Sequence, residues 1–391
     1  MRPTLACMGI AALAAALLCP DRLAAHEGHG TAAPRVKAQL AIDAAFAPNG
    51  WLWLVGVDAA GQLFTQASAD AGNTWEAPRH RDVGQDRIAA DGENRPRIAF
   101  GPERRVVIAY TRPLAQPYSG EIRLLRSDDG GASFAAPITV HQDRQAVGHR
   151  FPALAFDGRG VLHAVWIDKR ERPNAGSRAG AALYRSESAD GGRSFGADIK
   201  LAEGVCECCR IALAPAPDGQ VAALWRHVFA PNIRDHAFAR LDAATAAPVR
   251  ASFDDWRLDA CPHHGPGLAA AAEGYHAVWF GERNGRSAVR YARLAADGSP
   301  QSAAREIPDP YAEHADIAVS GQHVAIVWRS HDGEQTQLKA WVSADDGAHF
   351  VLHRLAASGG DNDHPRLLAT RTGFLVLWRT ATRLHVLPIP A

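Results

Sequence analysis

The residue types best suited to chemistry in this chain are cysteine and histidine, and they cluster. All four cysteines beyond position 19 stand in two short segments that also hold two histidines: GVCECCRIAL, with Cys206, Cys208 and Cys209, and CPHHGP, with Cys261, His263 and His264. Thiolate and imidazole are the ligands that soft and borderline metal ions select, above all copper(I) and zinc. The two segments therefore predict a metal site where the fold brings them together.

Disulfide bonding is the alternative use of the same cysteines. Four is an even number, and a bridge from Cys208 or Cys209 to Cys261 would join the two segments in an oxidising compartment. Cys206 could pair within its own loop. One bridge would leave two sulfurs and the histidines for a metal ion, so the two interpretations are compatible. If the first segment is extended, Cys206 and Cys208 face one side and Cys209 the other.

The elements that must position these residues are short β-hairpins. An apolar segment, a Gly-containing turn and a second apolar segment recur at intervals of roughly 55 residues. The second segment of each copy carries an aromatic residue: Trp53, Tyr110, Trp166, Trp225, Trp279, Trp328 and Trp378. Helical periodicity is nearly absent. This pattern predicts an all-β fold, a β-propeller of four-stranded blades.

A second motif, Ser-x-Asp-x-Gly-x-x-aromatic, occurs four times at blade spacing. Its copies are Ser68, Asp70, Gly72 and Trp75; Ser127, Asp129, Gly131 and Phe134; Ser188, Asp190, Gly192 and Phe195; and Ser343, Asp345, Gly347 and Phe350. Through this motif the chain resembles the sialidase-like β-propeller family with Asp-box (BNR) repeats, as a divergent member. The resemblance implies a structural hairpin turn between the third and fourth strands of a blade, whose aromatic packs between blades. LAADGSP, around Asp297, is a decayed fifth copy.

The repeats predict a single propeller domain, residues 37–391. Seven blades are expected, beginning near residues 37, 94, 149, 207, 261, 313 and 363. A six-bladed ring, as in most sialidases, is the alternative if one hairpin is an insertion. The seventh copy has room for only three strands, so we expect the segment from Thr31 to Val36 to supply its outer strand and close the ring.

In a propeller, the connections into the innermost strands lie on one face around the channel, called the top face below, where binding sites cluster. Histidines and arginines precede several of these strands: Arg95, His149, Arg150, Arg210, His314 and His364. The predicted metal ligands at the channel mouth are accordingly Cys206, Cys208, Cys209, Cys261, His149, His263, His264, His314 and His364.

The N-terminal sequence indicates export. An apolar run from Ile10 to Leu18, followed by small residues ending at Ala25, predicts a Sec-type signal peptide over residues 1–25 and a periplasmic or secreted protein. The following segment, 26–36, begins HEGHG, so His26 and His29 are either further copper ligands or part of a polar tail. Acidic and basic residues number 42 each, which argues against nucleic acid or an anionic membrane as partner.

The resemblance also implies an enzymatic alternative. Sialidases carry an Arg-Ile-Pro motif, three arginines for the substrate carboxylate, a tyrosine nucleophile and an aspartic acid as proton donor. The chain has no Arg-Ile-Pro sequence, and its tyrosines, including Tyr118 and Tyr311, lack a recognisable nucleophile context. The nearest candidates for the sialidase residues are Arg95, Arg150, Arg210, Asp168 and Tyr311. Asp168 has a second interpretation, as the partner of Arg170 in a loop.

Three functions follow from these observations. The preferred one is an exported metal-binding propeller that uses copper, with zinc as the alternative, in copper acquisition, storage or resistance or in metal redox chemistry. A metal ion or small ligand would bind at the top face, and an exported protein could be a partner. The second is an exo-α-sialidase or other glycoside hydrolase. The third is a disulfide-stapled recognition propeller without catalysis.

Overall fold

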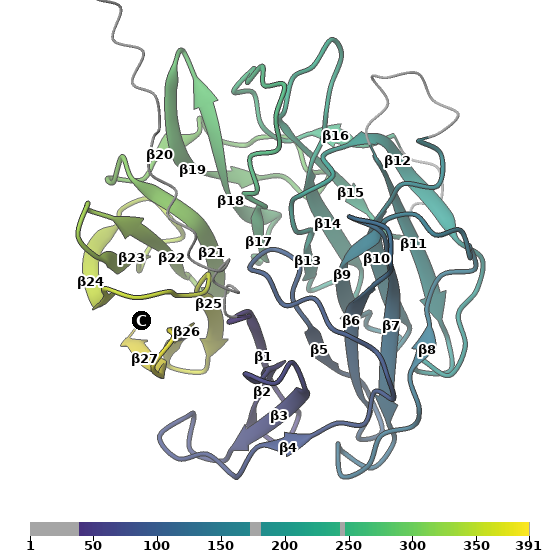
Figure 1. The fold of residues 1–391 in the computed structure, drawn as a ribbon. Helices are drawn as coiled ribbons and strands as arrows, with labels where there is room; N and C mark the ends of the chain where they lie inside the picture. The colour runs from purple at the N-terminus through teal and green to yellow at the C-terminus, as the bar shows by residue number, and fades with distance from the viewer. Residues whose placement is uncertain (1–38, 173–180, 243–246, 391) are drawn as a thin grey trace, which may run out of the picture. The chain divides into compact units, whose positions relative to one another are not determined.

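The repeated hairpins form seven antiparallel sheets around a common centre (Figure 1). The computed structural model of the protein describes residues 39–172, 181–242 and 247–390, within a compact unit that runs from Ala38 to Ala391. Each sheet follows chain order from its innermost strand outwards, and the innermost strands of neighbouring sheets contact one another, including the first and the last. The fold is therefore a seven-bladed β-propeller, as predicted.

The strands fall into four positions in the blades. The innermost strands are β1 (Ile42–Phe46), β5 (Arg97–Phe100), β9 (His149–Phe156), β13 (Ala212–Pro215), β17 (Gly267–Ala270), β21 (Ala312–Ser320) and β25 (Arg366–Thr370). The second strands are β2 (Leu52–Val57), β6 (Val106–Pro113), β10 (Leu162–Asp168), β14 (Val221–Arg226), β18 (Tyr275–Arg283), β22 (His323–His331) and β26 (Gly373–Arg379).

The outer two positions hold the remaining strands. The third strands are β3 (Leu63–Ser68), β7 (Gly120–Ser127), β11 (Ala181–Ser188), β15 (His236–Arg240), β19 (Arg286–Leu294), β23 (Thr336–Ser343) and β27 (Leu384–Pro390). The fourth strands are β4 (Arg79–His80), β8 (Ile138–Thr139), β12 (Ile199–Val205), β16 (Val249–Arg250), β20 (Arg305–Glu306) and β24 (Val351–Ser358).

The core lies between blades, where alternating strand residues from two sheets interlock. Six of the seven repeat aromatics are buried in these layers: Tyr110, Trp166, Trp225, Trp279, Trp328 and Trp378. Several indoles also donate to an acidic side chain, as Trp328 Nε1 does to Asp309 Oδ2 at 2.8 Å. The seventh aromatic departs from the pattern, because Trp53 stands near the start of β2 and is only partly buried.

The four Asp-boxes form the turns that the resemblance implied, each between the third and fourth strands of its blade. In the second box, Ser127 Oγ accepts from Gly131 N at 2.8 Å and donates to Asp129 Oδ1 at 2.7 Å. Gly131 has a φ of +86°, and a Cβ there would lie 2.5 Å from the Trp53 ring, so the position requires glycine. Phe134 packs against the core between the first and second blades. The box therefore joins a local turn to the packing between blades.

The seventh sheet has three strands, β25 to β27, in the part of the chain that the structure describes. The sequence predicted room for only three strands in this last copy, and the structure agrees. The outer strand predicted from Thr31 to Val36 lies outside the described residues, as do the signal peptide and the segment with His26 and His29. Among the described residues, no helix is both long enough and apolar enough to cross a membrane.

Candidate functional site

The first cysteine segment is a turn between β12 and β13, and its three sulfurs are in contact. The Sγ distances are 3.6 Å from Cys206 to Cys208, 3.5 Å from Cys208 to Cys209 and 3.9 Å from Cys209 to Cys206. All three side chains are buried. The alternation expected for an extended segment does not occur, because residues 207–209 form a turn instead of continuing a strand. The turn brings Cys209 to the same side as its neighbours.

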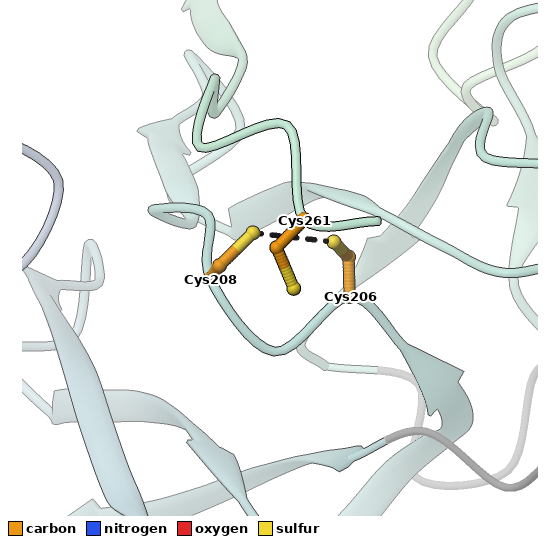
Figure 2. Close-up of side chains that lie close together, drawn as sticks. All are labelled: Cys206, Cys208 and Cys261. Atoms are coloured by element: carbon orange, nitrogen blue, oxygen red, sulfur yellow. Dashed lines mark hydrogen bonds between the residues drawn. The ribbon is translucent and has the colours of Figure 1, made fainter. Parts of the chain in front are cut away.

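Cys261 reaches the same place from the loop between β16 and β17, as Figure 2 shows. The sulfurs of Cys206, Cys208 and Cys261 all lie within 4.8 Å of one another. A tetrahedral ion with metal–sulfur bonds of about 2.3 Å separates its sulfurs by roughly 3.8 Å, whereas a disulfide needs about 2.0 Å. All four cysteines in the described part of the chain are free thiols, so the structure does not contain the bridge to Cys261 that the alternative interpretation would form. The spacing suits metal ligation. These four residues are called the thiol cluster below.

The surroundings of the thiol cluster favour a thiolate at one of its members. Hydrogen bonds from the thiols of Cys208, Cys209 and Cys261 hold the pKa of Cys206 well below its ordinary value, against the opposing effect of burial. Arg234 Nη1 lies 3.3 Å from Cys206 Sγ. Hydrogen bonds to Cys206, and further ones to Cys209 and Cys261, raise the pKa of Cys208, because they stabilise its protonated form. A bound cation would replace those protons and allow further thiols to ionise.

Three of the predicted histidine ligands form a separate group around Glu93. The Nδ1 atoms of His314 and His364 lie 3.2 and 3.3 Å from Glu93 Oε1. The rings of His264, His314 and His364 stack in a column, with centroid distances of 4.2 and 3.4 Å. The sequence placed these histidines beside the cysteines in one site, but the structure divides them into a thiol cluster and this second group, called the histidine cluster.

Glu93 is held by donors from two of the segments that carry the cysteines. Arg210 donates to it through Nη1 at 2.7 Å and through its main-chain N at 2.8 Å, and Gly265 N donates at 2.9 Å. Burial alone would raise the pKa of Glu93, but the Arg210 guanidinium and the imidazoles of His314 and His364 outweigh it and hold that pKa well below its ordinary value. Glu93 is therefore a buried carboxylate anion.

His149 lies in neither cluster. Its Nε2 atom is 2.9 Å from Asp143 Oδ2 and 3.6 Å from Asp168 Oδ2, and its ring stacks on His141. Asp168, the candidate proton donor, is fully buried and accepts from Trp166 Nε1 and Arg170 Nη2 at 2.8 and 2.6 Å. The predicted pairing of Asp168 with Arg170 thus agrees with the structure, but the predicted solvated loop does not, because Asp168 is the buried last residue of β10.

The remaining predicted residues lie in the loops ahead of innermost strands, except Arg150, which lies in β9. The three candidate clamp arginines each face a carboxylate of the chain: Arg95 with Asp363, Arg150 with Asp91, and Arg210 with Glu93. Tyr311 is exposed in the connection from β20 to β21. His263 is exposed, and among the described residues it joins none of the groups with metal-ligand spacing.

Sequence reasoning missed two functional candidates. Glu93 stands two residues before Arg95, in the same position ahead of an innermost strand from which the other ligands were taken, and this placement was the available signal. Arg234 approaches Cys206 from the connection between β14 and β15, and nothing in its local sequence marks it. An acidic residue before an innermost strand is therefore a candidate ligand in the same way as a histidine at that position.

Comparisons with known proteins support the fold. No family model and no curated protein matches the chain. Among solved structures, a polysaccharide lyase family PL25 ulvan lyase aligns with a TM-score of 0.56 at 12% identity, covering 90% of this chain and 93% of its own. An α-L-arabinofuranosidase from Fusarium graminearum aligns with a TM-score of 0.53 at 13% identity, covering 78% and 92%.

A Hadza microbial sialidase aligns with a TM-score of 0.49 at 14% identity, covering 84% of this chain and 73% of its own. The chain is thus a propeller structurally like carbohydrate-active enzymes at low sequence identity. This confirms the fold that the Asp-box resemblance implied. At such identities the likeness concerns the fold alone.

Proposed function

We propose that the protein is an exported metal-binding propeller whose thiol cluster binds copper(I). The observation that carries the proposal is the spacing of the sulfurs, 3.5 to 3.9 Å between Cys206, Cys208 and Cys209, with Cys261 beside them. Two overlapping sets of three sulfurs, those of Cys206, Cys208 and Cys209 and those of Cys206, Cys208 and Cys261, lie at distances that suit a shared ion and are too long for a disulfide. Cys261 is exposed and comes from a different connection than the three buried cysteines, so apolar packing alone does not account for its place beside them.

The chemistry of the ligands supports a soft ion. Thiolate ligands select copper(I) and zinc over harder cations, and a site with three or four sulfurs and no carboxylate belongs to that class. Copper is preferred over zinc because the expected signal peptide and the HEGHG segment are typical of exported copper carriers. Arg234 would offset negative charge on the bound thiolates. A role in copper acquisition, storage or resistance requires only such binding.

The test is metal content under competition. The full chain, purified with its thiols reduced, is offered equimolar copper(I) and zinc, and retained metal is measured by mass spectrometry. We expect near-stoichiometric copper in the parent protein and its loss in the Cys206→Ser/Cys208→Ser variant. The matched control is His263→Ala, which changes an exposed residue two positions from Cys261 and should keep the copper. Absence of metal from the parent, or its retention in the double variant, would refute the proposal.

A glycoside hydrolase is the second candidate, and the comparisons taken alone favour it. Two structural neighbours with TM-scores above 0.5 are named as carbohydrate-active enzymes, an arabinofuranosidase, which is a glycoside hydrolase, and a polysaccharide lyase, which is not. The contacts of the candidate residues favour it less, because Arg95 and Arg210 are buried in ion pairs with Asp363 and Glu93. Turnover of a sialoside or an arabinoside by the metal-free protein, abolished by Tyr311→Phe, would establish this function instead.

A further inference from the structure

Three residues of the histidine cluster come from three different blades. Glu93 precedes β5, His314 lies in β21, and His364 precedes β25, so no two of them come from the same blade. Their side chains are among the buried polar residues of the protein, between 5 and 8% exposed. One ligand atom of each lies within 4.8 Å of the others. Their meeting is therefore a property of the closed ring.

The distances within the cluster suit an ion. Tetrahedral coordination with bonds of about 2.0 to 2.1 Å separates nitrogen and oxygen ligands by roughly 3.3 Å. Glu93 Oε1 lies 3.2 Å from His314 Nδ1 and 3.3 Å from His364 Nδ1. His364 Nδ1 is buried, and its contact with Glu93 Oε1 lacks hydrogen-bond geometry. A buried imidazole nitrogen in such a poorly aligned contact is costly unless something else satisfies it.

His264 and Glu313 provide further donors next to these three residues. His264 stacks on His314, and its Nδ1 atom is also buried without a hydrogen-bond partner among the described residues. Glu313 Oε2 lies 3.8 Å from His314 Nε2. The rings of His314 and His364 are only 13° from parallel. One of them must therefore turn about its Cβ–Cγ bond before both lone pairs can meet one ion.

The ligand types suit a divalent ion. Two imidazoles and one carboxylate meet at the distances given above. Neutral imidazole and carboxylate are the ligand set of zinc and related divalent ions, whereas copper(I) prefers sulfur. The two clusters thus differ in the class of ion they suit.

We propose that Glu93, His314 and His364 form a second metal site, which binds a divalent first-row transition-metal ion such as zinc(II) or cobalt(II) and takes no ligand from the thiol cluster. The ion sits between Glu93 Oε1 and the two imidazoles, and these three protein ligands leave a fourth position open. The proposal does not rest on the copper(I) function, because none of its ligands is a cysteine.

Cobalt(II) is the probe that separates the two sites. Sulfur ligands give cobalt(II) an intense near-ultraviolet charge-transfer band, whereas nitrogen and oxygen ligands give only visible d–d bands. The full chain with all four cysteines of the thiol cluster changed to serine is stripped with chelator and titrated with cobalt(II). We expect saturable visible bands without the sulfur band. In the parent protein we expect the same visible bands together with the sulfur charge-transfer band. That added band would report cobalt(II) binding at the thiol cluster.

The variants test the named ligands. His364→Phe keeps a ring in the stack and removes the nitrogen, and we expect it to weaken cobalt(II) binding about a hundredfold or more in the cysteine-free background. His353→Ala, at an exposed position on β24, is the control and should leave the binding unchanged. His314→Gln is the second test variant, and thermal unfolding shows which variants are folded. Absence of visible bands in the cysteine-free protein, or undiminished bands in folded His364 and His314 variants, would overturn the proposal.

Discussion

Among the described residues, Arg210 is the only arginine whose guanidinium contacts Glu93. Replacing Arg210 therefore gives the sharpest test of the electrostatics around Glu93. Its Nη1 atom lies 2.7 Å from Glu93 Oε1, and both side chains are almost fully buried. The Arg210→Met variant keeps the apolar length of the side chain and the main-chain N that donates to Glu93. The substitution therefore deletes the charge and its hydrogen bonds while it leaves the backbone donors in place.

The expected cost follows from the charge that remains. Breaking a buried ion pair by removing one partner costs about 3–5 kcal/mol, because the other charge stays buried without compensation. Glu93 keeps the main-chain donors of Arg210 and Gly265 and the imidazole of His314. We therefore expect a loss near the lower end, about 3 kcal/mol in the free energy of unfolding. Adding Glu93→Gln should recover about 1–2 kcal/mol, since no buried charge is then left unpaired.

The assay is urea unfolding of chelator-treated protein at pH 7, followed by tryptophan fluorescence, for the parent, both single variants and the double variant. The interaction energy between the two positions comes from the double-mutant cycle. If Arg210→Met lies within about 0.5 kcal/mol of the parent, or if the double variant is no more stable than Arg210→Met, then Glu93 is not a buried anion held by Arg210 and the reasoning is wrong.

Two further predictions concern the Asp-boxes. Ser127→Ala removes the acceptor of Gly131 N and a donor to Asp129, and should lower the free energy of unfolding by about 1–2 kcal/mol. Ser299→Ala, in the exposed decayed copy, is the control and should change it little. Urea unfolding measures both variants. Asp70 has its pKa lowered from 3.8 to about 2 by hydrogen bonds from Thr74 and Ser68, so it stabilises the fold above pH 3.8 and this contribution is lost as the pH falls towards 2. Asp70→Asn should flatten the dependence of unfolding on pH over that range, and an unchanged slope would contradict the assignment.

The fold could be predicted from the sequence because its signals are local. An Asp-box such as Ser343 to Phe350 specifies its own turn within eight residues, and each hairpin carries its own apolar segments and glycine. Repetition of these units then implies a ring. Trp53 is the exception. It is the aromatic residue of the first copy in the sequence, but it lies near the start of its strand, β2.

The candidate site could be predicted only in part, because it depends on contacts between blades. The position of each loop ahead of an innermost strand correctly gathered the cysteines, but the turn at residues 207–209 that unites their sulfurs has no strong local signal. The separation of His264 from Cys261, three residues away, depends on His314 and Glu93 from other blades. His149 likewise turns towards Asp143 in its own neighbourhood.

Two loops each contribute to both clusters, so that any coupling between the two sites would pass through shared backbone. Residues 206–210 carry three of the sulfurs and then Arg210, and residues 261–265 carry Cys261 and then the Gly265 amide that donates to Glu93. An ion held by the sulfurs would restrict both backbones and thereby the donors that orient Glu93. If an ion bound at one site changes the affinity of the other site by some factor, an ion bound at that other site changes the affinity of the first by the same factor. An affinity measured at either cluster is then a function of what the other one holds.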